Sequence, residues 1–127
     1  MNEGRLGAPI GRRPVGQGWR LFLWLAAAFN FVVGLLGMLS PAASFDARLI
    51  GLFVFAFGIV YLQAARDPER LAPVLWAGVI AKVGTAALFA PQGFGADGSL
   101  LVASAVVIDA LFAVGFLAFL LSRGGDL

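Results

Sequence analysis

The sequence predicts an all-α integral membrane protein, an antiparallel up-down bundle of four helices with both termini in the cytoplasm. Of its 127 residues, 61% are hydrophobic and only 13% are charged, whereas a soluble domain is near half apolar and a quarter charged. So small a core cannot bury this apolar surplus, so lipid must cover the rest. The few charges also separate four long apolar stretches, and no stretch alternates apolar and polar residues as a half-buried strand would.

The first two predicted helices span residues 19–39 and 48–65. At 1.5 Å per residue, about 20 residues cross a hydrocarbon core of about 30 Å. Ser40-Pro41 ends the first helix, because proline cannot continue a helix and disfavours helical conformation in the residue before it. The second helix is short, and Arg48 can complete it by extending its side chain toward the interface.

The third predicted helix spans residues 71–90. Asp67-Pro68-Glu69 before it is typical of a helix start, with Asp as N-cap, Pro at the first position and an acid in the first turn. Pro73 then removes one backbone hydrogen bond. Two alternatives follow: the helix restarts at Pro73, or the segment before it lies along the membrane interface.

The remaining segments complete a single four-span domain over residues 19–122. Residues 91–98, which begin with proline and are rich in glycine, are expected to form a loop. The fourth helix is predicted over residues 99–122. The basic segment 1–18 is predicted to be disordered, and residues 123–127 form a short tail.

Arginine counts predict the orientation. With the N-terminus in the cytoplasm, four spans place only Arg48 on the opposite side. This excess in short loops matches the positive-inside rule and predicts that both termini of a multi-pass protein lie in the cytoplasm. Seven arginines then lie on the cytoplasmic side: Arg5, Arg12, Arg13, Arg20, Arg66, Arg70 and Arg123.

A cleaved signal peptide is the alternative for the first span. A basic start, an apolar run and Ala42-Ala43-Ser44 resemble a signal peptide with its cleavage site. The apolar run of about 19 residues is longer than the usual core of 7–15 residues, which favours a retained helix.

Three polar residues fall inside the predicted spans, where lipid penalises them. Counted from the cytoplasmic edge at 1.5 Å per residue, Asn30 lies about 15 Å deep, Lys82 about 16 Å and Asp109 about 18 Å. All three therefore lie in one layer, and small residues beside each favour close helix contacts. We predict a Lys82–Asp109 pair, either ionic or neutral by proton exchange, with Asn30 bonded to one of them.

The candidate cluster has two further members. Thr85 shares a helix face with Lys82, and the second helix contributes Tyr61, although Tyr61 and Trp76 also suit anchoring at the membrane interface. Large residues on other faces, such as Leu23, Leu35 and Leu111, are expected to face lipid.

Two functions remain open for this cluster. It binds a small or amphipathic ligand or acts in a proton-linked process, or it only fixes helix packing in a structural or accessory subunit. We predict no catalytic residues, no cofactor and no metal site, because the chain has no Cys and no His and no nucleophile beside a base. The expected partners are the lipid bilayer and a membrane protein or second copy of the chain; no nucleic acid is expected.

Three short runs resemble a known type of protein: residues 58–70 (GIVYLQAARDPER), residues 76–82 (WAGVIAK) and residues 108–112 (IDALF). The chain is similar to small uncharacterised four-helix bacterial membrane proteins and, more distantly, to DoxX-like proteins. This resemblance covers most of the chain after Trp19. It implies a four-helix inner-membrane protein and supplies neither an activity nor functional residues.

Overall fold

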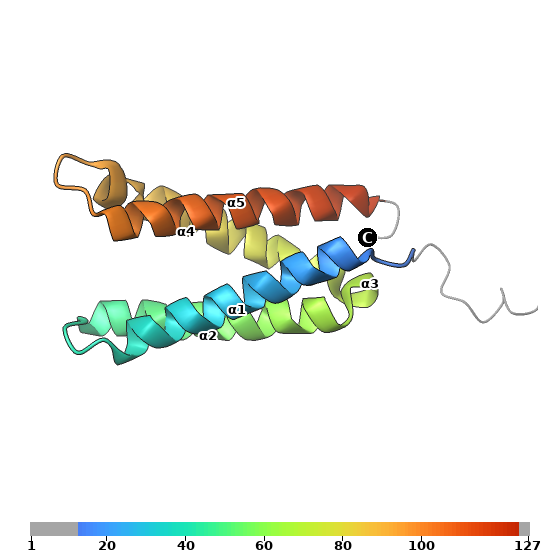
Figure 1. The fold of residues 1–127 in the computed structure, drawn as a ribbon, viewed down its shortest axis with the longest axis horizontal. Coiled ribbons are helices and arrows are strands. Elements are labelled where there is room, and N and C mark those ends of the chain that lie inside the picture. Colours follow the sequence, from blue (N-terminus) through green and yellow to red (C-terminus); the bar gives the residue numbers. More distant parts are fainter. Residues whose placement is uncertain (1–12, 125–127) are drawn as a thin grey trace, which may run out of the picture.

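The computed structural model describes residues 13–124, which form helices and no strands. Four helical segments are long and apolar enough to cross a membrane, and they run up and down in a four-helix bundle (Figure 1). The chain is thus a multi-pass membrane protein by length and composition of its helices. The elements are α1 (Gln17–Leu39), α2 (Phe45–Arg66), α3 (Pro68–Leu71), the 3₁₀ turn η2 (Ala72–Val74), α4 (Leu75–Phe94) and α5 (Leu100–Ser122).

The bundle consists of two hairpins, one of α1 and α2 and the other of α4 and α5 (Figure 1). Small residues bring the backbones together within each hairpin. A Cβ atom on Gly34 would lie 2.5 Å from the Phe55 nitrogen, and one on Gly93 would lie 2.7 Å from the Ala103 Cα. Contacts between the hairpins are far fewer. Each hairpin is therefore a tightly packed unit, as membrane helices with small interfacial residues form.

Aromatic side chains join the two hairpins at the end that holds the chain termini. Trp19 of α1 packs on Phe119 of α5 with ring centroids 5.2 Å apart, and Phe22 meets Phe116 edge-on at 5.7 Å. Phe116 and Phe119 are fully buried. These ring pairs fill the space between α1 and α5 in the offset and edge-to-face arrangements that aromatic rings prefer.

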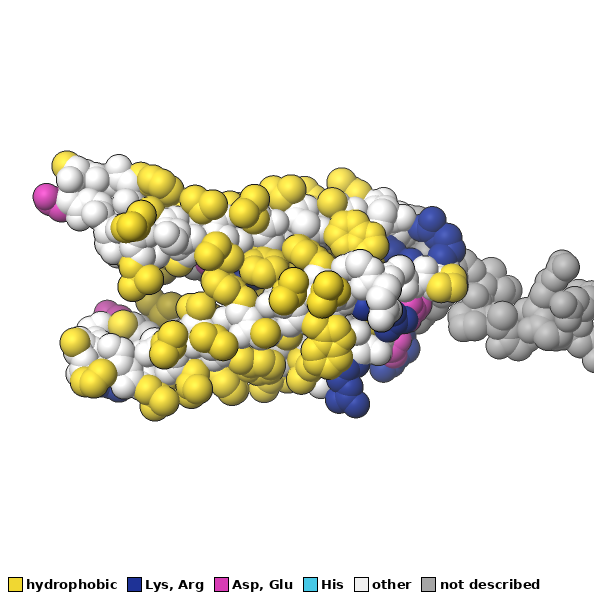
Figure 2. Space-filling model, in the orientation of Figure 1, with side chains coloured by type: hydrophobic (Ala, Val, Ile, Leu, Met, Phe, Trp, Pro, Cys, Tyr) yellow, Lys and Arg dark blue, Asp and Glu magenta, His cyan; other side chains and the backbone are white. Residues whose placement is uncertain are grey.

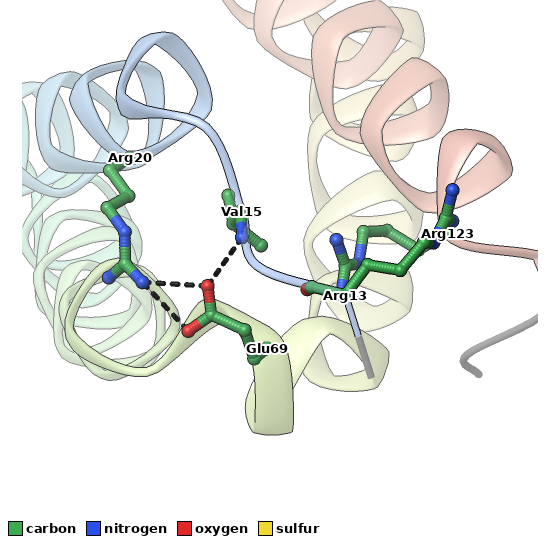
Figure 3. Close-up of polar contacts among 5 residues, drawn as sticks. All are labelled: Arg13, Val15, Arg20, Glu69 and Arg123. Atoms are coloured by element: carbon green, nitrogen blue, oxygen red, sulfur yellow. Dashed lines mark hydrogen bonds and ion pairs between the residues drawn. The ribbon is translucent and has the colours of Figure 1, made fainter. Parts of the chain in front are cut away.

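The segment before α1 also fastens this end (Figure 3). Glu69 of α3 accepts hydrogen bonds from the Val15 backbone N–H at 2.6 Å and from the Arg20 guanidinium at 2.7 and 2.8 Å. The Arg13 guanidinium donates to the Ser122 carbonyl at 2.6 Å, and Arg123 donates to the Arg13 carbonyl. We call these five residues with Ser122 the terminal clasp. Residues 1–12 of the segment expected to be disordered lie outside the described residues, as do 125–127.

Three helix boundaries differ from the predictions by three residues or more: the start of α2 and both ends of α4. Helix α4 continues through Pro91 to Phe94, where we expected a loop. Gly93 in this last turn packs closely against Ala103 of α5, and the Gly95 N–H donates to the Pro91 carbonyl. Helix α2 begins at Phe45, three residues early, because the Ser44 side chain accepts a hydrogen bond from the Ala47 N–H and caps it. At Pro73 the chain forms the 3₁₀ turn η2 and α4 then starts at Leu75, so the helix restarts as in the first alternative.

Apolar side chains cover most of the visible surface between the two ends (Figure 2). Leu35 and Leu111 are exposed, as expected for lipid-facing positions, but Leu23 is fully buried and its predicted lipid exposure was wrong. It lies in the core that forms where α1 meets the other helices near the termini. Figure 2 also shows the two hairpins parting at the end that holds the connecting loops.

Candidate functional site

Lys82 is the centre of a polar cluster between the two hairpins. Its Nζ atom donates to Asp109 Oδ1 at 2.7 Å and to Asn30 Oδ1 at 3.0 Å. The side chains of Lys82 and Asp109 are 5% and 15% exposed, and Asn30 is buried. Each residue lies near the middle of its helix. The structure therefore brings the three mid-span polar residues together into one buried ion pair with an amide beside it.

The cluster extends into a chain of hydrogen bonds across all four long helices. Asn30 of α1 also donates from Nδ2 to the Val54 carbonyl of α2, at 2.9 Å. The hydrogen-bonded chain thus runs from α2 through α1 and α4 to α5, by way of Val54, Asn30, Lys82 and Asp109. The bond between Lys82 and Asn30 connects the two hairpins near the middle of their helices.

Three aromatic rings surround the ammonium group of Lys82. Its Nζ lies 5.2 Å from the ring centroid of Phe29, 5.3 Å from that of Phe112 and 5.5 Å from that of Tyr61. Ring faces at this distance attract a cation and partly replace the water it has lost. Phe112 lies three residues after Asp109 on the same helix face, a spacing that could have indicated it. Phe29 precedes Asn30 directly, and adjacent helical residues do not share a face.

Tyr61 belongs to this site and not to the membrane interface. It is fully buried, packs 4.9 Å from Phe116 by ring centroids, and lies close to Gly78, where a Cβ atom would be 2.7 Å from its ring. The burial of Tyr61 favours its predicted place in the cluster over the alternative of an interface anchor, whereas Trp76 is 41% exposed. The Tyr61 hydroxyl is buried and has no hydrogen-bond partner among the described residues.

A cavity of about 490 Å³ opens beside the cluster, between the hairpins. Asn30, Lys82, Asp109 and Tyr61 lie at its inner end. The walls beyond them are almost entirely apolar and include Ile50 and Phe53 of α2, Leu88 of α4 and Leu101 of α5, which lie toward the loop end of the bundle. Figure 2 shows the separation of the hairpins at that end.

The other features of the site limit its chemistry. Thr85 lines the cavity one turn from Lys82. Within residues 13–124, no group of three or more His, Cys, Asp or Glu side chains could hold a metal ion. Asp109 Oδ1 accepts the bond from Lys82, and no described residue donates to its second oxygen. The arrangement can therefore hold a polar group against a carboxylate at the inner end of an apolar space.

Comparisons with protein families, with characterised proteins and with solved structures find no match to this chain. The resemblance to small four-helix membrane proteins and to DoxX-like proteins thus stays a prediction.

Proposed function

We propose that this protein binds an amphipathic ligand within the membrane, with the polar part of the ligand at Lys82 and Asp109. One observation carries the proposal: an apolar cavity of about 490 Å³ ends on a buried ion pair. Ligand pockets of about 300–1,000 Å³ combine this kind of apolar lining with a few polar groups that orient the ligand. A ligand with one polar end and one apolar end matches both parts of the cavity.

The cost of the ion pair also supports binding. A charged group at the centre of a membrane helix costs about 2.5–3.5 kcal/mol on insertion scales, whereas a hydrogen bond between membrane helices returns about 0.6 kcal/mol on average. An ion pair in this place contributes little to stability relative to apolar residues of the same size. Ionisable groups inside a membrane therefore commonly mark functional sites.

Saturable photolabelling tests this proposal. The purified protein in phosphatidylcholine vesicles is exposed to a long-chain alcohol that carries a diazirine, with and without excess unlabelled alcohol. We expect saturable labelling that maps to cavity residues such as Phe53 and Leu101, and its loss in Ala105→Phe, which fills the cavity. Ala110→Phe on the exposed face of α5 is the matched control. Labelling that excess alcohol does not displace, or that Ala105→Phe leaves intact, would overturn the proposal.

The hydrogen-bond chain favours a second candidate, an accessory or structural subunit. Asn30, Lys82 and Asp109 connect the hairpins, and the exposed apolar helix faces suit lipid, a membrane-protein partner or a second copy of the chain. In that case the cluster would only fix which helices pack together, a role that buried polar groups have in other proteins. Binding of an amphiphile at the cluster separates the two candidates.

We further propose that the protein lies in the bacterial inner membrane with both described ends of the chain in the cytoplasm. Arg13, Arg20, Arg70 and Arg123 lie at the end of the bundle where the termini meet, and Arg48 lies at the other end, where it donates to the Met38 carbonyl. The native chain has no cysteine. Cysteines introduced at Arg70 and at Phe45 should therefore react with an impermeant reagent only from the cytoplasmic and only from the outer side, respectively. The reverse pattern would contradict this orientation.

A further inference from the structure

We infer that the ligand of this site is a single-chain amphiphile whose head is an uncharged hydroxyl group, such as a long-chain alcohol. This inference rests on the proposed function and specifies its ligand class. Four properties of the cavity lead to it: the charge balance of the cluster, its unused hydrogen-bonding capacity, the depth of its polar end and its dimensions.

The cluster has no net charge as an ion pair. Lys82 contributes one positive charge, Asp109 one negative charge, and Asn30 none. A carboxylate head would place a second negative charge beside Asp109, and an ammonium head would place a second positive charge beside Lys82. Either would leave an uncompensated charge in a low-dielectric site, which is strongly unfavourable. An uncharged head preserves the balance.

The hydrogen-bonding capacity left in the cluster suits a head group that can both donate and accept. Both polar atoms of the Asn30 side chain are engaged, with Lys82 and with Val54. Lys82 uses two of the three N–H donors of its ammonium group, on Asn30 and Asp109, and the Tyr61 hydroxyl has no hydrogen-bond partner among the described residues. Asp109 can accept further hydrogen bonds, because an ionised carboxylate accepts several and only Lys82 donates to it among the described residues. A hydroxyl head can donate to the second oxygen of Asp109 and also accept from Lys82 or Tyr61.

The depth of the cluster in the bilayer is a second reason why a charged head group is unfavourable. Asn30, Lys82 and Asp109 lie near the middle of their helices, and thus near the middle of the bilayer. A head group must leave the water interface and cross hydrocarbon to reach them. A charged head pays a large penalty for this transfer, whereas a single hydroxyl pays a smaller one.

The dimensions of the cavity indicate one chain. Its lining on α2 runs from Ile50 to Tyr61, which is about 16 Å at 1.5 Å per residue. This length is about half of a hydrocarbon core of about 30 Å, the depth of one leaflet. With its head at Asp109, one chain would extend along Phe53 and Leu101 toward the loop end, between the parted hairpins.

Competition among three probes of equal chain length tests the head group. Hexadecanol, hexadecanoate and hexadecylammonium each compete with the photoreactive alcohol for the wild-type protein, with concentrations expressed per lipid. We expect hexadecanol to compete best and each charged probe to bind at least about tenfold more weakly. The free-energy cost of an unpaired charge in the membrane is larger than the free-energy difference that corresponds to a tenfold change in affinity. A charged probe that competes with the photoreactive alcohol as well as hexadecanol does, or better, would overturn the inference and leave the proposed function intact. Labelling that no probe displaces would overturn both.

A change of site charge provides a second test. Asp109→Asn leaves Lys82 unbalanced, so hexadecanoate should become the best competitor, while Asp97→Asn in the exposed loop should keep the wild-type order. If Asp109→Asn does not fold, the neutral double variant Lys82→Met/Asp109→Asn replaces it. This double variant should still favour hexadecanol, because the amide oxygen introduced at position 109 can accept a hydrogen bond from the hydroxyl head. An unchanged order in Asp109→Asn, or a preference for hexadecanoate in the double variant, would contradict selection by charge.

Discussion

The two ends of the bundle are held in different ways. At the terminal end, aromatic rings of α1 and α5 pack on each other and the terminal clasp ties the segment before α1 to α3 and α5. At the loop end, the hairpins part and the cavity lies between them. The polar cluster lies where dense packing gives way to the cavity.

This difference shows how the bundle can be stable and still contain an open space. Close backbone contacts, as at Gly34 and Gly93, hold each hairpin together independently of the other. The hairpins then need to be joined only at one end and at mid-depth, where Lys82 meets Asn30. The loop end does not need interhairpin packing, which leaves room for a ligand.

Loss of one partner of the ion pair should have the largest effect on this arrangement. Asp109→Leu leaves the Lys82 ammonium buried without a counter-charge, and we expect a loss of about 3–5 kcal/mol in the free energy of unfolding. Lys82→Met/Asp109→Leu should recover most of that loss. Denaturant unfolding in detergent micelles measures both variants, with Asp97→Asn as the control. Additive losses in the double variant would mean that the two side chains do not interact.

Adding a methyl group to the packed aromatic region at the terminal end should have the next largest effect on stability. A Cβ atom on Gly115 would overlap the ring of Phe22, which stands between α1 and α5. We expect Gly115→Ala to cost about 1–3 kcal/mol, the usual range for excess volume in a packed core. Gly84→Ala is the matched control, because no heavy atom lies within 4 Å of its added Cβ. Thermal unfolding of the detergent-solubilised protein measures both variants. Equal effects of the two substitutions would show that the aromatic rings between α1 and α5 are loosely packed.

Replacement of Tyr61 should have a smaller effect on the free energy of unfolding, and in the stabilising direction. Its buried hydroxyl has no partner among the described residues, and a buried polar group without a partner costs about 1–3 kcal/mol. Tyr61→Phe should therefore leave the free energy of unfolding unchanged or raise it by about 1 kcal/mol. Unfolding of the ligand-free protein checks this. A clear loss of stability would show that the hydroxyl is hydrogen-bonded.

The terminal clasp should give the smallest change. Arg20 and Glu69 are 32% and 25% exposed, so their ion pair is worth at most about 1 kcal/mol. Glu69→Gln should lower the free energy of unfolding by that amount or less, and added salt should reduce the difference. Arg70→Gln, which removes the more exposed pair with Asp67, should have less effect. A salt-independent loss in Glu69→Gln would assign the effect to the hydrogen bonds and not to charge.

The sequence predicted the four helices because charge is scarce and its position marks each helix end. It also predicted which residues could meet, since Asn30, Lys82 and Asp109 share a depth and a small-residue face. The partners of mid-depth residues on other faces depend on how the helices rotate and tilt, which hydropathy does not determine. For that reason Leu23 was assigned to the lipid-facing surface, and anchoring at the membrane interface was left open for Tyr61, although both are buried. The extension of α4 beyond Pro91 likewise depends on packing of Gly93 against Ala103, a contact distant in sequence.

The central claim is that Lys82 and Asp109 form a binding site and do more than fix helix packing. Saturable photolabelling of Lys82→Met/Asp109→Leu, measured after its stability is known, tests this claim most directly. We expect the double variant to fold with a free energy of unfolding within about 1 kcal/mol of the wild type and to lose the saturable labelling by the photoreactive alcohol. A folded double variant that is labelled like the wild type would contradict the claim and leave the pair with a structural role alone.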